Sequence, residues 1–321
     1  MKRIPFLGFL LDKKGSALEL KYEELNSVDT TDKILWVHFD YSTQEAKDWI
    51  RNQCNNSIVA DALLADETRP RTTLLGDSLL LALRGVNLDP HSRPENMISI
   101  RLFISSNMII STSRRTLLSV TEIIEELRKG TGVKSTSEFL VELTHRMIDR
   151  MDDVIDQLQD RTDYLEENII DMKNQEFRTE ILNVRRETII LKRYLAPQKE
   201  ALIKLSNEKI SWIDEYKKVE IRETNDQLIR HIEELDTIRD KVILIQEELA
   251  NSLSEEMNKK MYMLSIISAI FLPLTFLTGL LGINVGGIPG ASNDKAFYIF
   301  TIILLLVIFS QYIIFKKKKW I

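Results

Sequence analysis

Cysteine is almost absent from the 321-residue sequence, which contains only Cys54. A single cysteine cannot form an internal disulfide, which excludes a small disulfide-stabilised domain and favours a reducing compartment such as the cytoplasm. Hydrophobic residues make up 44% of the chain and charged residues 28%. That balance excludes a disordered tail and predicts one or two sizeable buried cores.

Charged residues are absent from two long stretches near the C-terminus, 261–293 and 296–315. Each reaches the roughly 20 apolar residues needed to cross a hydrocarbon core of about 30 Å. We therefore predict a protein of the cytoplasmic membrane with transmembrane helices at 261–282 and 296–315, joined by an outer loop at 283–295. Lysines precede the first span and follow the second in a basic tail at 316–321, whereas the loop carries one lysine. Both termini are therefore expected in the cytoplasm.

The soluble part of the chain is acidic. The first 260 residues contain 38 basic and 47 acidic side chains, a net charge of −9, whereas residues 261–321 carry a net charge of +4. This charge argues against a nucleic-acid partner and is compatible with cations.

Strand and helix patterns alternate in the N-terminal part of the chain. Runs of strand formers occupy 34–40, 78–86, 97–103 and 108–112, stretches with helical spacing occupy 43–53 and 57–65, and residues 4–11 are typical of a strand that enters a hairpin. We predict a cytoplasmic α/β domain over residues 1–120.

Helical periodicity dominates residues 121–260. An amphipathic helix is expected over 148–169, and a second helix over 176–205, broken or bent near Pro197. A third pattern runs from about residue 211 to residue 282 at heptad-like spacing, which predicts one long stalk helix that continues into the first span. The predicted fold is thus an α+β cytoplasmic domain, a long helical stalk and two C-terminal transmembrane helices.

One face of the first span combines apolar, hydroxyl and small residues, namely Met261, Leu264, Ser268, Leu272, Thr275 and Gly279. Such a face can line an aqueous path, with collars at Met261, Leu264 and Leu272 that close by dewetting. Two helices cannot enclose a path, so several copies would be needed. The alternative is that the hydroxyls bond to backbone and the small residues permit close packing. The second span is almost purely apolar, which favours contact with lipid.

Five of the eleven glycines lie between Gly279 and Gly290. This clustering predicts a tight turn at the outer end of the first span, and Asn284 is the polar residue within it. Repeated around an oligomer axis, the Asn284 carboxamide oxygen can accept hydrogen bonds from the water shell of a cation.

The motif Gly282-Ile283-Asn284, after a long helix and before a lysine tail, resembles the CorA-type metal ion transporters, most of which carry Gly-Met-Asn. The longer string over residues 271–290 resembles the ZntB zinc transporter branch of that superfamily. The resemblance implies a funnel-shaped homopentamer in the lipid bilayer, with Gly282, Ile283 and Asn284 at the outer pore mouth and the 261–279 face as the pore lining. It implies transport of divalent cations, zinc first, with magnesium, cobalt or nickel as the alternative. The replacement of methionine by isoleucine argues against magnesium selectivity.

Direct zinc coordination favours Cys, His and carboxylate ligands, and neither span contains any. We therefore predict no dehydrated metal site in the pore and no cofactor besides the transported cation. Zinc is expected to pass largely hydrated, contacting Asn284, Thr275 and Ser268 through its waters.

Acidic residues recur on the polar face of the 148–169 helix, at Asp152, Asp156, Asp160, Asp163 and Glu167. They form either a solvated helix face or a stripe that attracts cations near the cytoplasmic mouth. The four histidines, His38, His91, His145 and His231, lack metal-ligand spacing, and we expect structural roles for them and for Cys54.

The lysines at 316–319 favour anchoring to an anionic leaflet. The resemblance offers a second interpretation, a basic ring that opposes cation passage. The sequence contains no nucleophile elbow, phosphate-binding glycine loop or catalytic metal cluster, so we predict a non-enzyme. A different class stays open, a membrane-tethered signalling or scaffold protein whose glycine-rich loop tolerates change.

Overall fold

The computed structural model describes residues 6–54, 56–89, 92–169, 175–283, 288, 290 and 293–318. The chain divides into two compact units, Met1–Gln246 and Glu247–Ile321. Helix α7, Glu215–Gly282, begins in the first unit and ends in the second.

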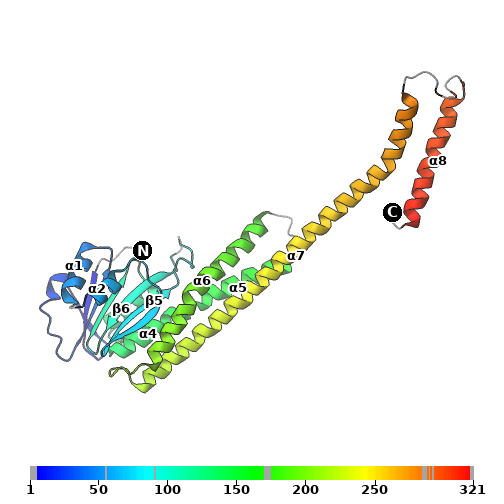
Figure 1. Cartoon of the computed structure of the whole chain (residues 1–321). Helices are drawn as coiled ribbons and strands as arrows, with labels where there is room; N and C mark the ends of the chain where they lie inside the picture. Colours follow the sequence, from blue (N-terminus) through cyan, green and yellow to red (C-terminus); the bar gives the residue numbers. More distant parts are fainter. Residues whose placement is uncertain are drawn as a thin grey trace. The chain divides into compact units, whose positions relative to one another are not determined.

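The first unit contains a seven-stranded sheet, from which the long helices extend (Figure 1). The spatial order is β2-β1-β3-β7-β6-β5-β4; the β3–β7 pair is parallel and the other pairs are antiparallel. The strands are β1 (Phe6–Leu11), β2 (Ala17–Leu20), β3 (Ile34–Asp40), β4 (Arg71–Leu75), β5 (Ser78–Gly85), β6 (Ile98–Ile104) and β7 (Met108–Ser113). A short 3-10 helix, η1 (Tyr22–Glu24), follows β2.

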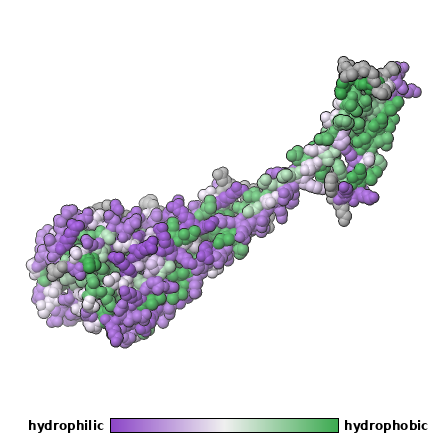
Figure 2. Space-filling model, viewed as in Figure 1, coloured by the Kyte–Doolittle hydropathy of each residue, from purple (hydrophilic) through white to green (hydrophobic). Residues whose placement is uncertain are grey.

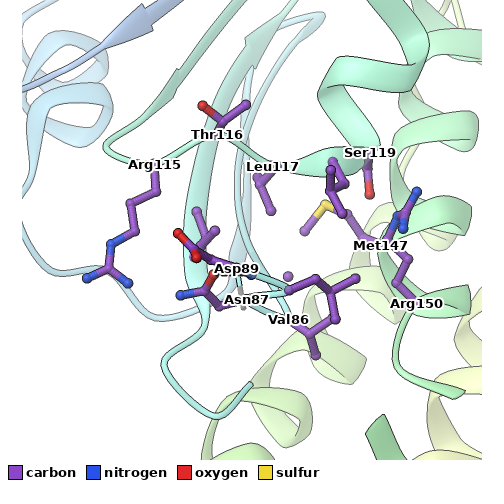
Figure 3. Close-up of a pocket in the computed structure, with 13 residues that line it drawn as sticks. Val86, Asn87, Asp89, Arg115, Thr116, Leu117, Ser119, Met147 and Arg150 are labelled. Carbon is purple, nitrogen blue, oxygen red and sulfur yellow. Dashed lines mark hydrogen bonds between the residues drawn. The ribbon is translucent and has the colours of Figure 1, made fainter. Parts of the chain in front are cut away.

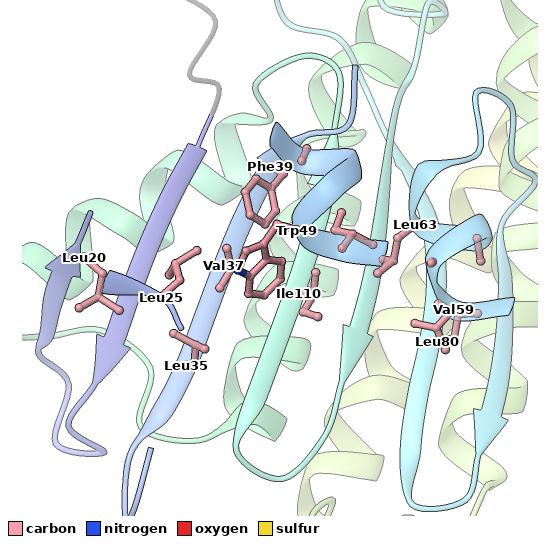
Figure 4. Packing of buried hydrophobic residues seen from close by; sticks show 14 of the residues in the cluster. Leu20, Leu25, Leu35, Val37, Phe39, Trp49, Val59, Leu63, Leu80 and Ile110 are labelled. Atoms are coloured by element: carbon pink, nitrogen blue, oxygen red, sulfur yellow. The ribbon is translucent and has the colours of Figure 1, made fainter. Parts of the chain in front are cut away.

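Helices cover both faces of the sheet. All seven residues of β3 are buried. Alternate residues of a strand point to opposite faces. Leu35, Val37 and Phe39 belong to the cluster that α1 (Gln44–Gln53) and α2 (Ser57–Leu64) cover (Figure 4). On the other face Trp36 packs against Phe139 of α4 (Thr136–Asp149), with ring centroids 4.7 Å apart. Burial on both faces explains why β3 is a continuous hydrophobic run.

The helices that follow the sheet are α3 (Leu118–Lys129), α4 (Thr136–Asp149), α5 (Asp152–Glu167), α6 (Gln175–Asn207) and α7. The prediction of one continuous amphipathic helix over 148–169 was wrong, because the helix is interrupted at Arg150 and Met151. The Met151 amide donates to the carbonyl of Ile148 at 2.8 Å in a tighter turn. The apolar spacing continues through this turn, so periodicity could not reveal it.

Of the break or bend predicted near Pro197, the break is absent, because α6 includes Pro197 within one continuous helix. Contacts with the sheet hold this part of the helix. The side chain of Gln198 accepts from the Arg84 amide at 2.7 Å, and Thr72 donates to the carbonyl of Ala201 at 2.6 Å. Tertiary contacts thus override the local cost of the proline.

The stalk helix α7 begins at Glu215, a few residues later than predicted. The segment before it is tied to the β4–β5 turn, since the amide of Ser211 donates to Asp77 at 2.8 Å and the Trp212 indole donates to the Asp77 carbonyl at 2.8 Å. The apolar seam predicted on α7 is buried at Leu228, Leu235, Ile238, Val242 and Ile245. Beyond Ile245 the described part of α7 has no buried residue.

Candidate functional site

The end of α7 and helix α8, Ala296–Lys317, are each long and apolar enough to cross a membrane. The most apolar 18-residue stretch of each helix contains no buried residue. Figure 2 shows this surface as largely hydrophobic. A core helix of a soluble protein would be buried, so within the described chain that alternative fails for both. These helices require lipid or other copies of the chain around them.

One face of each apolar helix is partly covered by the other. On α8 the partly covered or buried residues recur every three or four positions, at Ala296, Phe300, Leu304, Val307, Gln311 and Phe315. On α7, beyond residue 260, the partly covered residues are Ile266, Ala269, Ile270, Pro273, Leu274 and Leu277. These two partly covered faces meet where Gln311 Nε2 donates to the carbonyls of Ala269 at 3.2 Å and Ile270 at 3.5 Å. We call this contact the α7–α8 seam.

The residues predicted to line a path lie on the other side of α7. At about 100° per residue, their mean direction is about 180° around the helix from the α7–α8 seam. All are exposed in the single chain; Met261 is 63% and Leu272 is 70% accessible. The structure thus brings Met261, Leu264, Ser268, Leu272, Thr275 and Gly279 onto one open face, which we call the α7 stripe.

The hydroxyl groups of this span differ in their partners. Ser265 donates to the carbonyl of Met261 at 2.8 Å, and Thr278 donates to that of Leu274 at 2.9 Å. Both lie to the sides of the α7 stripe. The side-chain hydroxyls of Ser268 and Thr275, within the stripe, have no hydrogen-bond partner in the portion of the chain that the structure describes, although the Thr275 carbonyl accepts from Thr278 at 3.1 Å. The alternative in which hydroxyls merely bond to their own helix therefore fits Ser265 and Thr278, and leaves Ser268 and Thr275 available for water.

At the outer end, Gly282 is the last residue of α7 and Ile283 follows it with half of its surface exposed. Asn284 lies outside the described residues. A Cβ atom added to Gly279 or Gly282 would meet no atom of the described residues within 4 Å. Packing among the described residues of one chain therefore gives no reason for these glycines, whereas close approach of a second copy would.

The acidic stripe on α5 divides into two groups. Asp163 accepts a 2.7 Å hydrogen bond from Lys241 of α7, which lowers the pKa of Asp163, and Asp152 Oδ1 lies 2.9 Å from His231 Nε2, outside hydrogen-bond geometry. Asp156, Asp160 and Glu167 are exposed and have no ion-pair partner among the described residues. Asp152 also accepts a 3.4 Å hydrogen bond from Gln227 Nε2 of α7. Two of the five predicted residues thus bond to α7, and three face solvent.

Metal-ligating side chains do not gather in the described parts of the chain, where no group of three His, Cys, Asp or Glu residues could hold an ion. His38 lies between the hydroxyls of Ser111 and Ser113, at 2.8 and 3.2 Å, and burial lowers the pKa of His38 to about 4. Burial raises the pKa of the Cys54 thiol. His91 lies outside the described residues.

The first unit contains a cavity of about 250 Å³ where the loop after β5 meets the start of α3 (Figure 3). Its charged lining residues are Asp89, Arg115 and Arg150, and Arg150 also pairs with Glu122. Because both signs of charge meet there, the cavity does not select one class of ion. Its residues come from four separate segments of the chain without a shared motif, so no sequence signal indicated it.

Comparisons with known proteins agree with this architecture. Residues 31–317 match the family described as CorA-like Mg2+ transporter protein. The chain is 37% identical over 318 residues to the divalent cation transporter CmaX of Pseudomonas aeruginosa, covering 98% of this chain and 96% of that protein. It is 30% identical over 315 residues to the zinc transport protein ZntB of Yersinia enterocolitica, covering 98% and 95%.

Solved structures show the same fold. The structure of full-length CmaX matches with a TM-score of 0.85 and 36% identity, covering 99% of each chain. The complete CorA magnesium transporter from Methanocaldococcus jannaschii matches with a TM-score of 0.82 and 15% identity, covering 100% of each chain. These likenesses confirm the predicted fold class of an α/β domain, a long helix and two C-terminal apolar helices.

Proposed function

The chain belongs to the family of CorA-like Mg2+ transporter proteins, and on this basis we propose that it carries divalent metal cations across the cytoplasmic membrane, zinc foremost. The observation that carries the proposal is the α7 stripe, an exposed face on the side of α7 away from α8, with two side-chain hydroxyls that have no partner among the described residues. Transport through such a path needs no catalytic residue, so we propose that the protein is not an enzyme.

The path requires several copies of the chain. In one chain the α7 stripe is open, and two helices cannot enclose an aqueous route. A homo-oligomer, which we propose to be a pentamer, would bring the stripes together around an axis, with Gly282, Ile283 and Asn284 at the outer mouth. Each α8 would then lie outside its own α7, against lipid. In this arrangement, atoms of an adjacent copy would fill the open space beside Gly279 and Gly282.

Zinc is proposed as the main cargo because ZntB relatives share the full length of the chain and because Ile283 stands where most of the superfamily has methionine. CmaX is described only as a divalent cation transporter, which keeps magnesium, cobalt or nickel as the alternative. The spans offer hydroxyl and amide oxygens and no Cys, His or carboxylate. We therefore propose that the ion passes with most of its water shell.

The lysines support an orientation with both termini in the cytoplasm. Lys259 and Lys260 precede the first span, and Lys316 and Lys317 end α8. The connection between the spans carries only Lys295. Basic residues favour the cytoplasmic side, where anionic lipids also attract them.

The test is ion flux into proteoliposomes that hold the purified protein. We expect zinc uptake well above that of protein-free vesicles, and slower uptake of magnesium, cobalt and nickel at the same free concentration. Magnesium flux without zinc flux would contradict zinc as the cargo and favour magnesium. A correctly assembled oligomer that moves none of these ions would contradict transport and favour the membrane-tethered scaffold.

A separate prediction concerns the three residues of the predicted acidic stripe that have no ion-pair partner in the described chain, Asp156, Asp160 and Glu167. We expect Asp156→Asn, Asp160→Asn and Glu167→Gln together to raise the zinc concentration for half-maximal flux about threefold at low ionic strength, because they remove a field that concentrates cations. The measurement is the zinc dependence of flux in the same vesicles.

Asp163→Asn is the control for this variant, because Asp163 is already paired with Lys241. It is expected to lower thermal stability and leave the zinc dependence unchanged. An unaltered zinc dependence in the triple variant would show that α5 presents only a solvated face.

A further inference from the structure

A proline interrupts the hydrogen bonding of α7 within its apolar part. Pro273 lies inside the helix and has no backbone N–H, so the carbonyl four residues earlier, that of Ala269, loses its helical donor. In hydrocarbon no water is available to replace that donor, and an unsatisfied carbonyl is costly. Something else must donate to Ala269.

The donor is on the other apolar helix. Gln311 Nε2 lies 3.2 Å from the Ala269 carbonyl and 3.5 Å from that of Ile270. Gln311 is the one polar side chain among the six residues of α8 in the α7–α8 seam. Its Oε1 is buried without a partner among the described residues. The two facing carbonyls accept hydrogen bonds and cannot donate, so the amide must present its nitrogen to them.

We propose that Gln311 is a positioning residue for the transport path: its amide supplies the hydrogen bond that Pro273 removes and so holds α8 against the back of α7. The bond lies between the levels of Ser268 and Leu272, two residues of the α7 stripe. It fixes the rotation of α7 at the position where that stripe must face the axis. This inference rests on the proposed transport function and adds a residue that touches no ion.

A double-mutant cycle on zinc flux tests the proposal. Gln311→Leu is expected to lower the maximal flux about fivefold or more, with little change in the half-saturating zinc concentration, because the carbonyl is left without a donor. In Pro273→Ala, residue 273 regains an N–H that donates to Ala269. Adding Gln311→Leu to Pro273→Ala is then expected to change flux less than twofold. Ser310→Ala, an exposed hydroxyl next to Gln311, is the control and is expected to retain wild-type flux.

The outcomes separate this inference from the proposed function. Absence of flux in the wild-type protein would contradict transport itself. Wild-type flux in Gln311→Leu, or an equal fractional loss with proline and with alanine at 273, would overturn the coupling. If Gln311→Leu does not assemble, the same cycle is read by size-exclusion chromatography, with Gln311→Met as a second variant of similar volume. Recovery of the oligomer by Pro273→Ala supports the proposal, and equal loss in both backgrounds contradicts it.

Discussion

We expect Asn284→Ala to reduce zinc flux to that of protein-free vesicles, while the purified protein keeps its wild-type oligomeric size. Asn284 follows directly after Ile283, at the outer end of α7, and is itself outside the described residues. No charged residue lies between positions 261 and 293. The amide oxygens of several copies would therefore be the strongest acceptors for the water shell of an entering cation. Alanine removes that acceptor from every copy at once, so the expected loss is large.

Asn293→Ala is the matched control, because it changes the same residue type in the same connection between the spans. The Asn293 side chain accepts a 2.9 Å hydrogen bond from the Lys295 amide at the start of α8, which is a local structural role. We expect this variant to transport zinc at close to the wild-type rate. Intact flux in Asn284→Ala would remove Asn284 from the mechanism, and equal loss in both variants would indicate a general effect on the loop.

The strands that are buried on both faces could be read from the sequence with accurate bounds. The predicted strand at 34–40 coincides with β3, and the predicted strands at 78–86, 97–103 and 108–112 correspond to β5, β6 and β7 within one residue at each end. Strand β4 was not predicted. It lies at the edge of the sheet, and its residues are mostly half-exposed, so it lacks a strong hydrophobic signal.

The helical breaks could not be read in the same way, since they depend on contacts between distant residues. The apolar spacing continues through Arg150 although the chain turns there, and Pro197 stays within a helix because α6 packs on β4 and β5. Periodicity reports which face of a helix is buried, and it carries no information on which partner satisfies a particular carbonyl.

For the candidate site, helical spacing was sufficient to select the α7 stripe, and the structure adds the reason to prefer that face. The partly covered residues of α7 lie opposite it, and α8 supplies the cover through Gln311. The sequence gives no indication of the role of Gln311, because its partner, Ala269, is 42 positions away. The assignment of the stripe as a pore lining stays a prediction.

Labelling with a charged thiol reagent tests that assignment directly, because the chain has a single cysteine to remove. In a Cys54→Ser background we expect Ser268→Cys to transport zinc until a positively charged methanethiosulfonate is added. Zinc flux should then fall about tenfold or more. The reason is that a fixed positive charge from each copy would repel a divalent ion in a narrow, low-dielectric path.

Ile267→Cys, one residue earlier and about 100° around the helix, is the control. A cysteine there would face away from the axis, where a charged reagent has no aqueous access and the thiol does not ionise. The measurement is zinc flux before and after reagent, with release by a reducing agent to show that the block is the mixed disulfide. Block at position 267 without block at position 268 would place the path on a different face of α7. We expect block at position 268 because of how the hydroxyls of this span are bonded. Ser265 and Thr278 donate to carbonyls of their own helix, whereas the Ser268 hydroxyl has no partner in α7 or α8 within the described chain.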